Sequence, residues 1–272
     1  MSTLEEAVAI EVDEGQQVRG TFIAPGTLMP GVLFVHGWGG SQAQYVARAR
    51  AVAALGCVCL TFDLRGHAEN RLQFETVSRS ANLRDVEAAY DLLAARRYVD
   101  PQAIAVIGSS YGGYLAAILT TLRPVRWLGL RAPALYMDSG WDLPKLQLRK
   151  EQDLVTYRKS LVPAESNRAL RACQAFAGDV LLIESEFDDI IPPAVVASYR
   201  QAATHTRSLT FRCIKGADHG LTGEEGQRAY TSVLVTWLKE MVAQARVGQV
   251  PAAVPEHAGQ PEKPPEAIRE DA

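Results

Sequence analysis

The chain has 272 residues, of which 47% are hydrophobic and 22% are charged, and its formal net charge is -3. These proportions are typical of a globular protein and exclude a disordered, collagen-like or coiled-coil chain. The stretch from Val247 to Ala272 carries five acids and two bases, so the preceding 246 residues are neutral in sum. A neutral body lacks the basic field that attracts nucleic acids or an anionic membrane surface, and we expect neither as a partner.

The N-terminal residues predict a cytoplasmic protein. Residues 1–15 (MSTLEEAVAIEVDEG) open with acids and lack the basic segment followed by an apolar run that marks a signal peptide. No run of about eighteen consecutive apolar residues occurs, so we also expect no membrane-spanning helix.

Strand and helix patterns then alternate along the chain. Residues 8–22 alternate apolar and polar side chains around Asp13-Glu14-Gly15, which predicts an antiparallel hairpin at a sheet edge. The later strands are apolar throughout, as in a parallel sheet covered on both faces, and are expected at 31–35, 57–62, 104–108, 127–131, 180–184 and 209–214. Amphipathic helices are expected between them, at 42–55, 83–95, 111–121, 194–203 and 225–245. The pattern predicts one α/β domain over residues 1–246, with a mostly parallel sheet of about eight strands and helices on both faces.

Two segments break this alternation. Residues 136–176 lie between two predicted strands and contain two charged helical stretches, 146–159 and 165–173. An insertion there would lie over the carboxyl ends of the strands and act as a small helical cap, although a pair of structural crossover helices would fit the same pattern. Residues 247–272 contain five prolines and no apolar periodicity, which predicts a disordered, Pro-rich acidic tail.

A strand-to-helix turn carries the strongest motif, Gly108-Ser109-Ser110-Tyr111-Gly112. A G-x-S-x-G sequence in this context lifts the central serine above the sheet, because a Cβ at either glycine would clash where the backbone doubles back. Ser110 lies midway between the glycines and is therefore the candidate nucleophile, in preference to Ser109. The alternative is a Gly/Ser-rich helix N-terminus that performs no chemistry.

Candidate partners for the serine follow two later strands. Asp188 and Asp189 come after strand 180–184, and His219 lies on a glycine-flanked loop after strand 209–214. An acid and a histidine beyond strand ends can reach a serine above the sheet, in the chain order serine, acid, histidine. We predict Ser110, Asp188 and His219 as the catalytic residues. Asp189 is the competing acid and would otherwise cap the turn that follows.

The run HGWGG at 36–40 follows the first central strand. Loops of this type supply a backbone N–H to the oxyanion that forms when a nucleophile attacks a carbonyl group. We expect the amides of Trp38 and Tyr111 to be the two donors, with His36 holding the loop and His67 facing solvent. No spacing of histidines, cysteines and carboxylates fits a metal site, so we expect neither a metal nor a cofactor.

Together, five motifs resemble those of the α/β-hydrolase superfamily: HGWGG at 36–40, DLRGH at 63–67, GSSYGG at 108–113, EFDDIIPP at 186–193 and GADHG at 216–220. They occur in the family's order, and the resemblance covers about residues 17–245. The stretch S-Y-G-G-Y is most similar to the serine esterase and prolyl-oligopeptidase-like branches. This resemblance implies an α/β-hydrolase fold and cleavage of a carboxylic ester or a related acyl bond through an acyl-enzyme.

The expected substrate is a small molecule with an acyl group. The candidates for the lining of its pocket are Trp38, Tyr136, Met137, Trp141 and Leu143, and the alternative is that they belong to the core. An amide or peptide hydrolase with the same three residues would need an anchor for a peptide terminus, for which Glu151 or Asp153 is available. A non-catalytic binding protein on the same fold would be expected to have lost one of the three residues, and all three are present.

Overall fold

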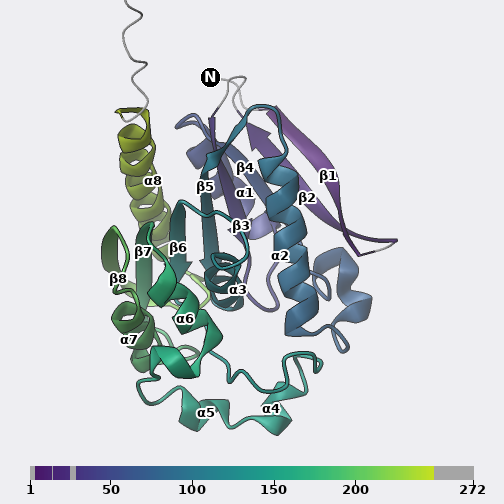
Figure 1. The fold of residues 1–272 in the computed structure, drawn as a ribbon, viewed down its shortest axis with the longest axis vertical. Helices are drawn as coiled ribbons and strands as arrows, with labels where there is room; N and C mark the ends of the chain where they lie inside the picture. The colour runs from purple at the N-terminus through teal and green to yellow at the C-terminus, as the bar shows by residue number, and fades with distance from the viewer. Residues whose placement is uncertain (1–3, 14, 25–28, 248–272) are drawn as a thin grey trace, which may run out of the picture.

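A mixed eight-stranded sheet runs through the centre of the computed structural model, which describes residues 4–13, 15–24 and 29–247 (Figure 1). Its strands are β1 (Leu4–Asp13), β2 (Gln16–Ala24), β3 (Met29–Val35), β4 (Val58–Phe62), β5 (Val99–Ser109), β6 (Trp127–Arg131), β7 (Asp179–Phe187) and β8 (Ser208–Asp218). Their order in the sheet is β1-β2-β4-β3-β5-β6-β7-β8. Strands β1 and β2 are antiparallel to their neighbours, and β3 to β8 are parallel. The predicted sheet and its edge hairpin are confirmed, although Glu14 in the hairpin turn lies outside the described residues.

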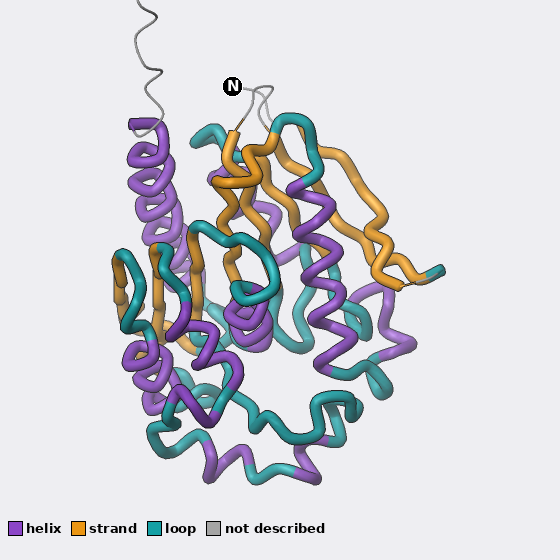
Figure 2. The backbone as a smooth tube through the Cα atoms, viewed as in Figure 1, coloured by secondary structure: helices purple, strands orange, loops and turns teal. Residues whose placement is uncertain are grey.

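Helices cover both faces of this sheet (Figure 2). One face carries α1 (Ala43–Ala53) and α8 (Glu224–Val247), and the other carries α2 (Arg79–Ala94), α3 (Tyr111–Leu119), α6 (Arg168–Ala175) and α7 (Pro193–Ala202). Four short pieces complete the set: η1 (Ala68–Gln73), α4 (Leu148–Glu151), α5 (Leu154–Tyr157) and η2 (Ala164–Ser166). Within the described ranges, no helix combines the length and the apolarity needed to cross a bilayer. Residues 248–272, the predicted tail apart from Val247, lie outside the description.

The central strands are apolar on both sides because each side packs in a separate core. In β5, Ile104 and Val106 join the core beneath α2, α3, α6 and α7, whereas Ala105 and Ile107 join the core beneath α1 and α8. All four side chains are at most 1% exposed. Successive strand residues point to opposite faces, so a strand covered on both faces needs an unbroken apolar run. This is why a continuous apolar pattern predicted the parallel part of the sheet.

The secondary structure between β6 and β7 differs from the two helices that the sequence predicts there. The predicted helix 146–159 is replaced by α4 and α5, because the backbone is extended at Gln152 (φ -126°, ψ 128°) and Asp153 starts a new turn by accepting a hydrogen bond from the Thr156 amide (3.0 Å). The second predicted helix forms as α6, but it packs against α3 and α7 on the sheet. In Figure 1, α4 and α5 lie beyond the ends of the strands.

Buried Arg79 in α2 holds the first loop of this segment. Its guanidinium donates to the carbonyl oxygens of Met137 (2.7 Å) and Ser139 (2.5 Å), and it lies over the rings of Tyr136 and Trp141. The side chain is 0% exposed. Hydrogen bonds from a charged donor are among the stronger polar contacts in a protein, so this loop is tied firmly to α2.

Candidate active site

Ser110 occupies a strained turn between β5 and α3. Its backbone angles (φ 51°, ψ -117°) fall in a region that residues with a Cβ rarely adopt. Three hydrogen bonds impose this conformation: the Ser110 amide donates to the Arg131 carbonyl (2.9 Å), and the Ser110 carbonyl accepts from the amides of Tyr114 (3.1 Å) and Ala134 (2.9 Å). These bonds hold the turn in a conformation that presents the hydroxyl at the end of the sheet.

The two glycines of the motif are required by backbone packing. A Cβ on Gly108 would lie 2.4 Å from the Gly112 carbonyl oxygen, and a Cβ on Gly112 would lie 2.2 Å from the Val35 carbonyl oxygen. Neither obstacle is a side chain that could rotate away. The sequence argument for glycine at both positions agrees with this geometry, which brings the start of α3 against the end of β3.

Ser110, His219 and Asp188 form a continuous hydrogen-bonded series. The Ser110 Oγ and His219 Nε2 atoms are 3.1 Å apart, and His219 Nδ1 lies 2.8 Å from Asp188 Oδ2. The side chains of His219 and Asp188 are 19% and 4% exposed. Three segments that are distant in sequence thus place a hydroxyl, an imidazole and a carboxylate in line.

Backbone amides complete the environment of Asp188. Its Oδ1 atom accepts hydrogen bonds from the amides of Ile190 (3.0 Å) and Ile191 (2.7 Å), while Oδ2 faces the imidazole. Burial acts to raise the pKa of Asp188, but the hydrogen bonds from His219 and from these amides outweigh it, so the pKa is lowered from its usual value. Asp188 is therefore ionised at neutral pH. Asp189 is exposed, and the carboxylate that is hydrogen-bonded to His219 is that of Asp188.

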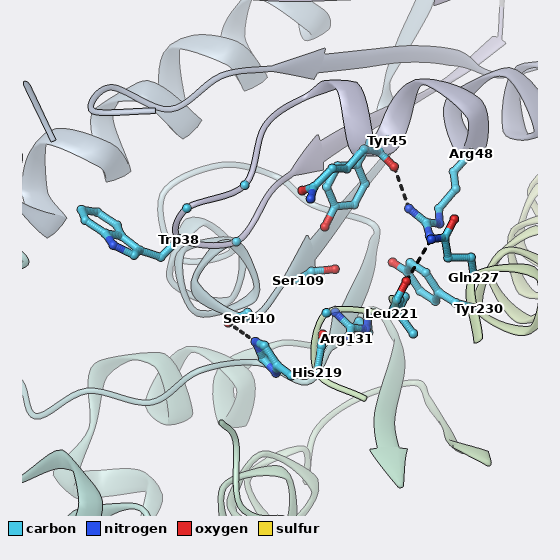
Figure 3. A pocket seen from close by; sticks show the side chains of 15 residues that line it. Trp38, Tyr45, Arg48, Ser109, Ser110, Arg131, His219, Leu221, Gln227 and Tyr230 are labelled. Atoms are coloured by element: carbon cyan, nitrogen blue, oxygen red, sulfur yellow. Dashed lines mark hydrogen bonds between the residues drawn. The ribbon is translucent and has the colours of Figure 1, made fainter. Parts of the chain in front are cut away.

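The HGWGG loop lies directly against Ser110. A Cβ on Gly37 would lie 3.3 Å from Ser110 Cβ and 3.9 Å from Ser110 Oγ, so the loop backbone passes beside the hydroxyl. Within the described part of the chain, the amides of Trp38 and Tyr111 donate to no protein acceptor. The indole of Trp38 points away from the serine (Figure 3). Both amides thus stay available to an oxygen atom near Ser110.

A cavity of about 250 Å³ opens beside Ser110 (Figure 3). It lies between the HGWGG loop, the first turns of α1 and α8, the end of β6 and the His219 loop. Its lining residues are Gly37, Trp38, Gly39, Gly40, Gln44, Tyr45, Arg48, Ser109, Ser110, Arg131, His219, Gly220, Leu221, Gln227 and Tyr230.

Of the residues predicted to line a substrate pocket, Trp38 lines the cavity beside Ser110 and the others do not. These others are Tyr136, Met137, Trp141 and Leu143. Tyr136 is 6% exposed and packs in the core against the rings of Tyr111 and Tyr114, as the alternative reading of these residues expected. The cavity beside Ser110 is formed instead by the HGWGG loop, α1, α8, the end of β6 and the His219 loop.

Sequence reasoning missed several polar residues of this cavity, among them Arg48, Arg131 and Tyr230. The sequence held a signal for Arg131, because a charged residue ends the otherwise apolar strand WLGLR. In the structure, Arg131 pairs with Ser109, which precedes the candidate nucleophile. No such signal exists for Arg48 or Tyr230. Their helical positions place them beside the serine only after α1 and α8 pack together on one face of the sheet.

Two buried histidines support the HGWGG loop. His36 Nδ1 donates to the Gly37 carbonyl (2.8 Å), and its Nε2 accepts from the Leu64 amide (3.0 Å), which agrees with the expected structural role. The prediction that His67 faces solvent is wrong: the residue is 2% exposed, because the ring of Trp38 packs on it at 4.6 Å between centroids. Burial lowers the pKa of each histidine to about 4.

These two histidines should make the fold sensitive to mild acid. Between about pH 6.5 and pH 4 the unfolded chain binds protons at both residues and the folded chain does not, so the free energy of unfolding should fall as the pH falls through this range. At about 1.4 kcal/mol per pKa unit, each histidine accounts for up to roughly 3 kcal/mol of the loss. Urea unfolding at a series of pH values measures it. His67→Phe should remove about half of the effect, and an unchanged pH dependence in this variant would contradict the assignment.

Comparison with known proteins agrees with this fold. Residues 43–245 match the prolyl oligopeptidase family. Rv2307c, an uncharacterised protein of Mycobacterium tuberculosis (strain ATCC 25618 / H37Rv), is 29% identical over 216 residues, which cover 78% of this chain and 71% of that protein.

Solved structures with low sequence identity share the fold. Est1E from Butyrivibrio proteoclasticus with bound ferulic acid has a TM-score of 0.69 at 17% identity, covering 87% of this chain and 100% of that one. The Pyrococcus furiosus esterase PF2001 has a TM-score of 0.65 at 17% identity, covering 88% of this chain and 92% of that one. Because the family match spans most of its length, the chain belongs to the prolyl oligopeptidase family and is an α/β hydrolase.

Proposed function

We propose that the protein hydrolyses carboxylic esters of small acyl groups, with Ser110 as nucleophile, His219 as proton carrier and Asp188 as the group that orients His219. The observation that carries this proposal is the hydrogen-bonded series with separations of 3.1 Å and 2.8 Å. Both distances are within the range that proton transfer and orientation require. The esterases named above share the fold and favour the same reaction class.

Each residue has a defined task in this reaction. His219 Nε2 accepts the Ser110 proton as Oγ attacks the ester carbonyl, and Asp188 stabilises the imidazolium that forms. His219 then gives the proton to the departing alcohol, leaving an acyl group on Ser110. Water, deprotonated by the same imidazole, attacks this acyl-enzyme and releases the acid. The ionised state of Asp188 follows from its lowered pKa.

The amides of Trp38 and Tyr111 are the proposed donors to the oxyanion of each tetrahedral intermediate. Tyr111 begins α3, so its amide and the helix N-terminus both favour negative charge beside Ser110. The Trp38 amide belongs to the loop whose backbone passes the serine at Gly37. Fixed donors of this kind stabilise charge as it develops without having to reorganise.

Ester hydrolysis is favoured over peptide hydrolysis by what surrounds the serine. Among the described residues that line the cavity there is no carboxylate to hold a peptide amino terminus. Glu151 and Asp153, the candidate anchors, line a separate hollow together with Asp189 and Ile190. This second hollow includes neither Ser110 nor His219.

Hydrolysis of p-nitrophenyl esters tests the proposal. We expect turnover of the acetyl, butyryl and hexanoyl esters and a decline for the decanoyl ester, because the cavity of about 250 Å³ is small for a substrate site. Peptidyl p-nitroanilides should be poor substrates. Turnover of the anilides with no turnover of the esters would overturn the proposed class of substrate.

A further inference from the structure

The cavity beside Ser110 is lined by cationic side chains. Arg48 and Arg131 line it, together with His219, and none of the described lining residues is an aspartate or glutamate. No carboxylate of the described residues lies within ion-pair distance (4.0 Å) of either arginine. The 246 residues before Val247 are neutral in sum, so this cavity is a local positive site in a neutral body.

Arg131 is fixed in the wall of the cavity. It is 6% exposed, and its Nη2 donates to Ser185 Oγ (3.2 Å) and to the carbonyl oxygens of Asp218 (3.3 Å) and His219. All these acceptors are uncharged, and the buried Nε atom has no partner among the described residues. Burying a charge without an opposite charge is costly, so an anion bound in the cavity would offset the charge of this guanidinium.

Arg48 approaches the same place from α1. Its Nη1 donates to the Gln44 carbonyl (2.7 Å), and its buried Nε likewise has no partner in the described residues. The guanidinium of Arg48 lies 4.9 Å from the centroid of the Tyr230 ring, and that of Arg131 lies 6.0 Å from the same centroid. Both guanidiniums line the same cavity, so an anion bound in it would have two cationic neighbours. Figure 3 shows both side chains in the wall that the serine and His219 also form.

We propose that Arg48 and Arg131 bind a carboxylate of the substrate, so that the preferred substrates are small esters with a negative charge. The inference rests on the proposed ester hydrolysis and adds the class of substrate to it. Guanidinium groups suit this task, because their planar forks match the geometry of a carboxylate. The carboxylate could belong to the acyl part or to the alcohol part of the ester, and the two parts can be tested separately.

Two pairs of substrates distinguish these sources. On the acyl side, p-nitrophenyl hydrogen adipate and p-nitrophenyl hexanoate have acyl chains of equal length that end in a carboxylate or a methyl group. On the alcohol side, p-acetoxybenzoate and its methyl ester differ in the same way. We expect kcat/KM for the anionic member of one pair to exceed that of the neutral member by about 10- to 100-fold. Added salt should reduce this preference.

Matched variants assign the preference to the cavity. Arg48→Met should lower the ratio of the two kcat/KM values by about tenfold or more. Arg50→Met removes the same charge from the same helix, but Arg50 is an exposed residue paired with Glu5 outside the cavity, so the ratio should stay near the wild-type value. Arg131→Gln should lower the ratio and also slow the neutral ester, because Arg131 holds the His219 loop.

Calorimetric binding to the Ser110→Ala protein separates this inference from the proposed function. Adipate should bind and adipamide should not, and Arg48→Met in that background should abolish adipate binding. Turnover of neutral esters with no anionic preference in either pair would overturn the inference and leave the proposed function standing. Adipate binding without turnover of any ester would support the anion site and overturn the proposed reaction.

Discussion

Ser110→Ala should reduce the turnover of p-nitrophenyl butyrate by about 10⁴-fold or more. The substitution removes the one oxygen that His219 Nε2 contacts at 3.1 Å, so no acyl-enzyme can form. The cavity, the HGWGG loop and the free amides of Trp38 and Tyr111 would remain. Steady-state kinetics with a blank for spontaneous hydrolysis measures the loss.

Ser109→Ala is the matched control for this change. Ser109 precedes the nucleophile, ends β5 and is 3% exposed, and its hydroxyl makes no hydrogen bond with His219. The turn at Ser110 is imposed by backbone bonds and by the two glycines, which this substitution leaves in place. We therefore expect Ser109→Ala to keep most of the activity. Losses of similar size in the two variants would contradict the choice of Ser110.

Asp188→Asn should reduce ester turnover by about 10⁴-fold while leaving the fold intact. The carboxylate accepts a hydrogen bond from the N–H at His219 Nδ1, so Nε2 is left free to accept the proton of Ser110. An asparagine amide in that place would donate to Nδ1 and favour the tautomer that carries its proton on Nε2. This tautomer cannot act as a base toward Ser110. Kinetics combined with urea unfolding separates the chemical loss from a loss of stability.

Asp189→Asn tests the choice between the adjacent acids. Asp189 is exposed and lies in the hollow lined by Glu151 and Asp153, away from His219. Its substitution should change kcat/KM only slightly. Loss of activity in Asp189→Asn with activity retained in Asp188→Asn would show that the acid has been assigned to the wrong residue.

The fold was predictable because its central strands are apolar throughout. The run Ile104–Ile107 reads as a strand covered on both faces, and the structure places its alternate residues in two separate cores. Strand ends were less predictable. The predicted strand started at residue 104, whereas β5 begins at Val99. The prediction missed these first residues because Asp100, Pro101 and Gln102 continue the strand without adding to its buried apolar run.

The candidate site was predictable in part for a topological reason. Ser110, Asp188 and His219 each follow a parallel strand, and the carboxyl ends of parallel strands meet at one edge of a sheet. The cavity wall was not predictable in this way. Arg48 and Tyr230 lie on helices, and the period of a helix shows which face is buried but not which other helix packs beside it. His67 was placed wrongly because a loop residue gives no periodic signal of burial.

Covalent labelling tests the assignment of Ser110 most directly. The intact protein would be treated with a serine-directed fluorophosphonate, and its mass would be measured beside that of Ser110→Ala. A nucleophilic serine held by His219 and Asp188 should give one adduct per chain in the wild type, located at Ser110 by peptide mapping, and none in the variant. An unlabelled wild-type protein, or equal labelling of the variant, would contradict the assignment of Ser110 as the nucleophile.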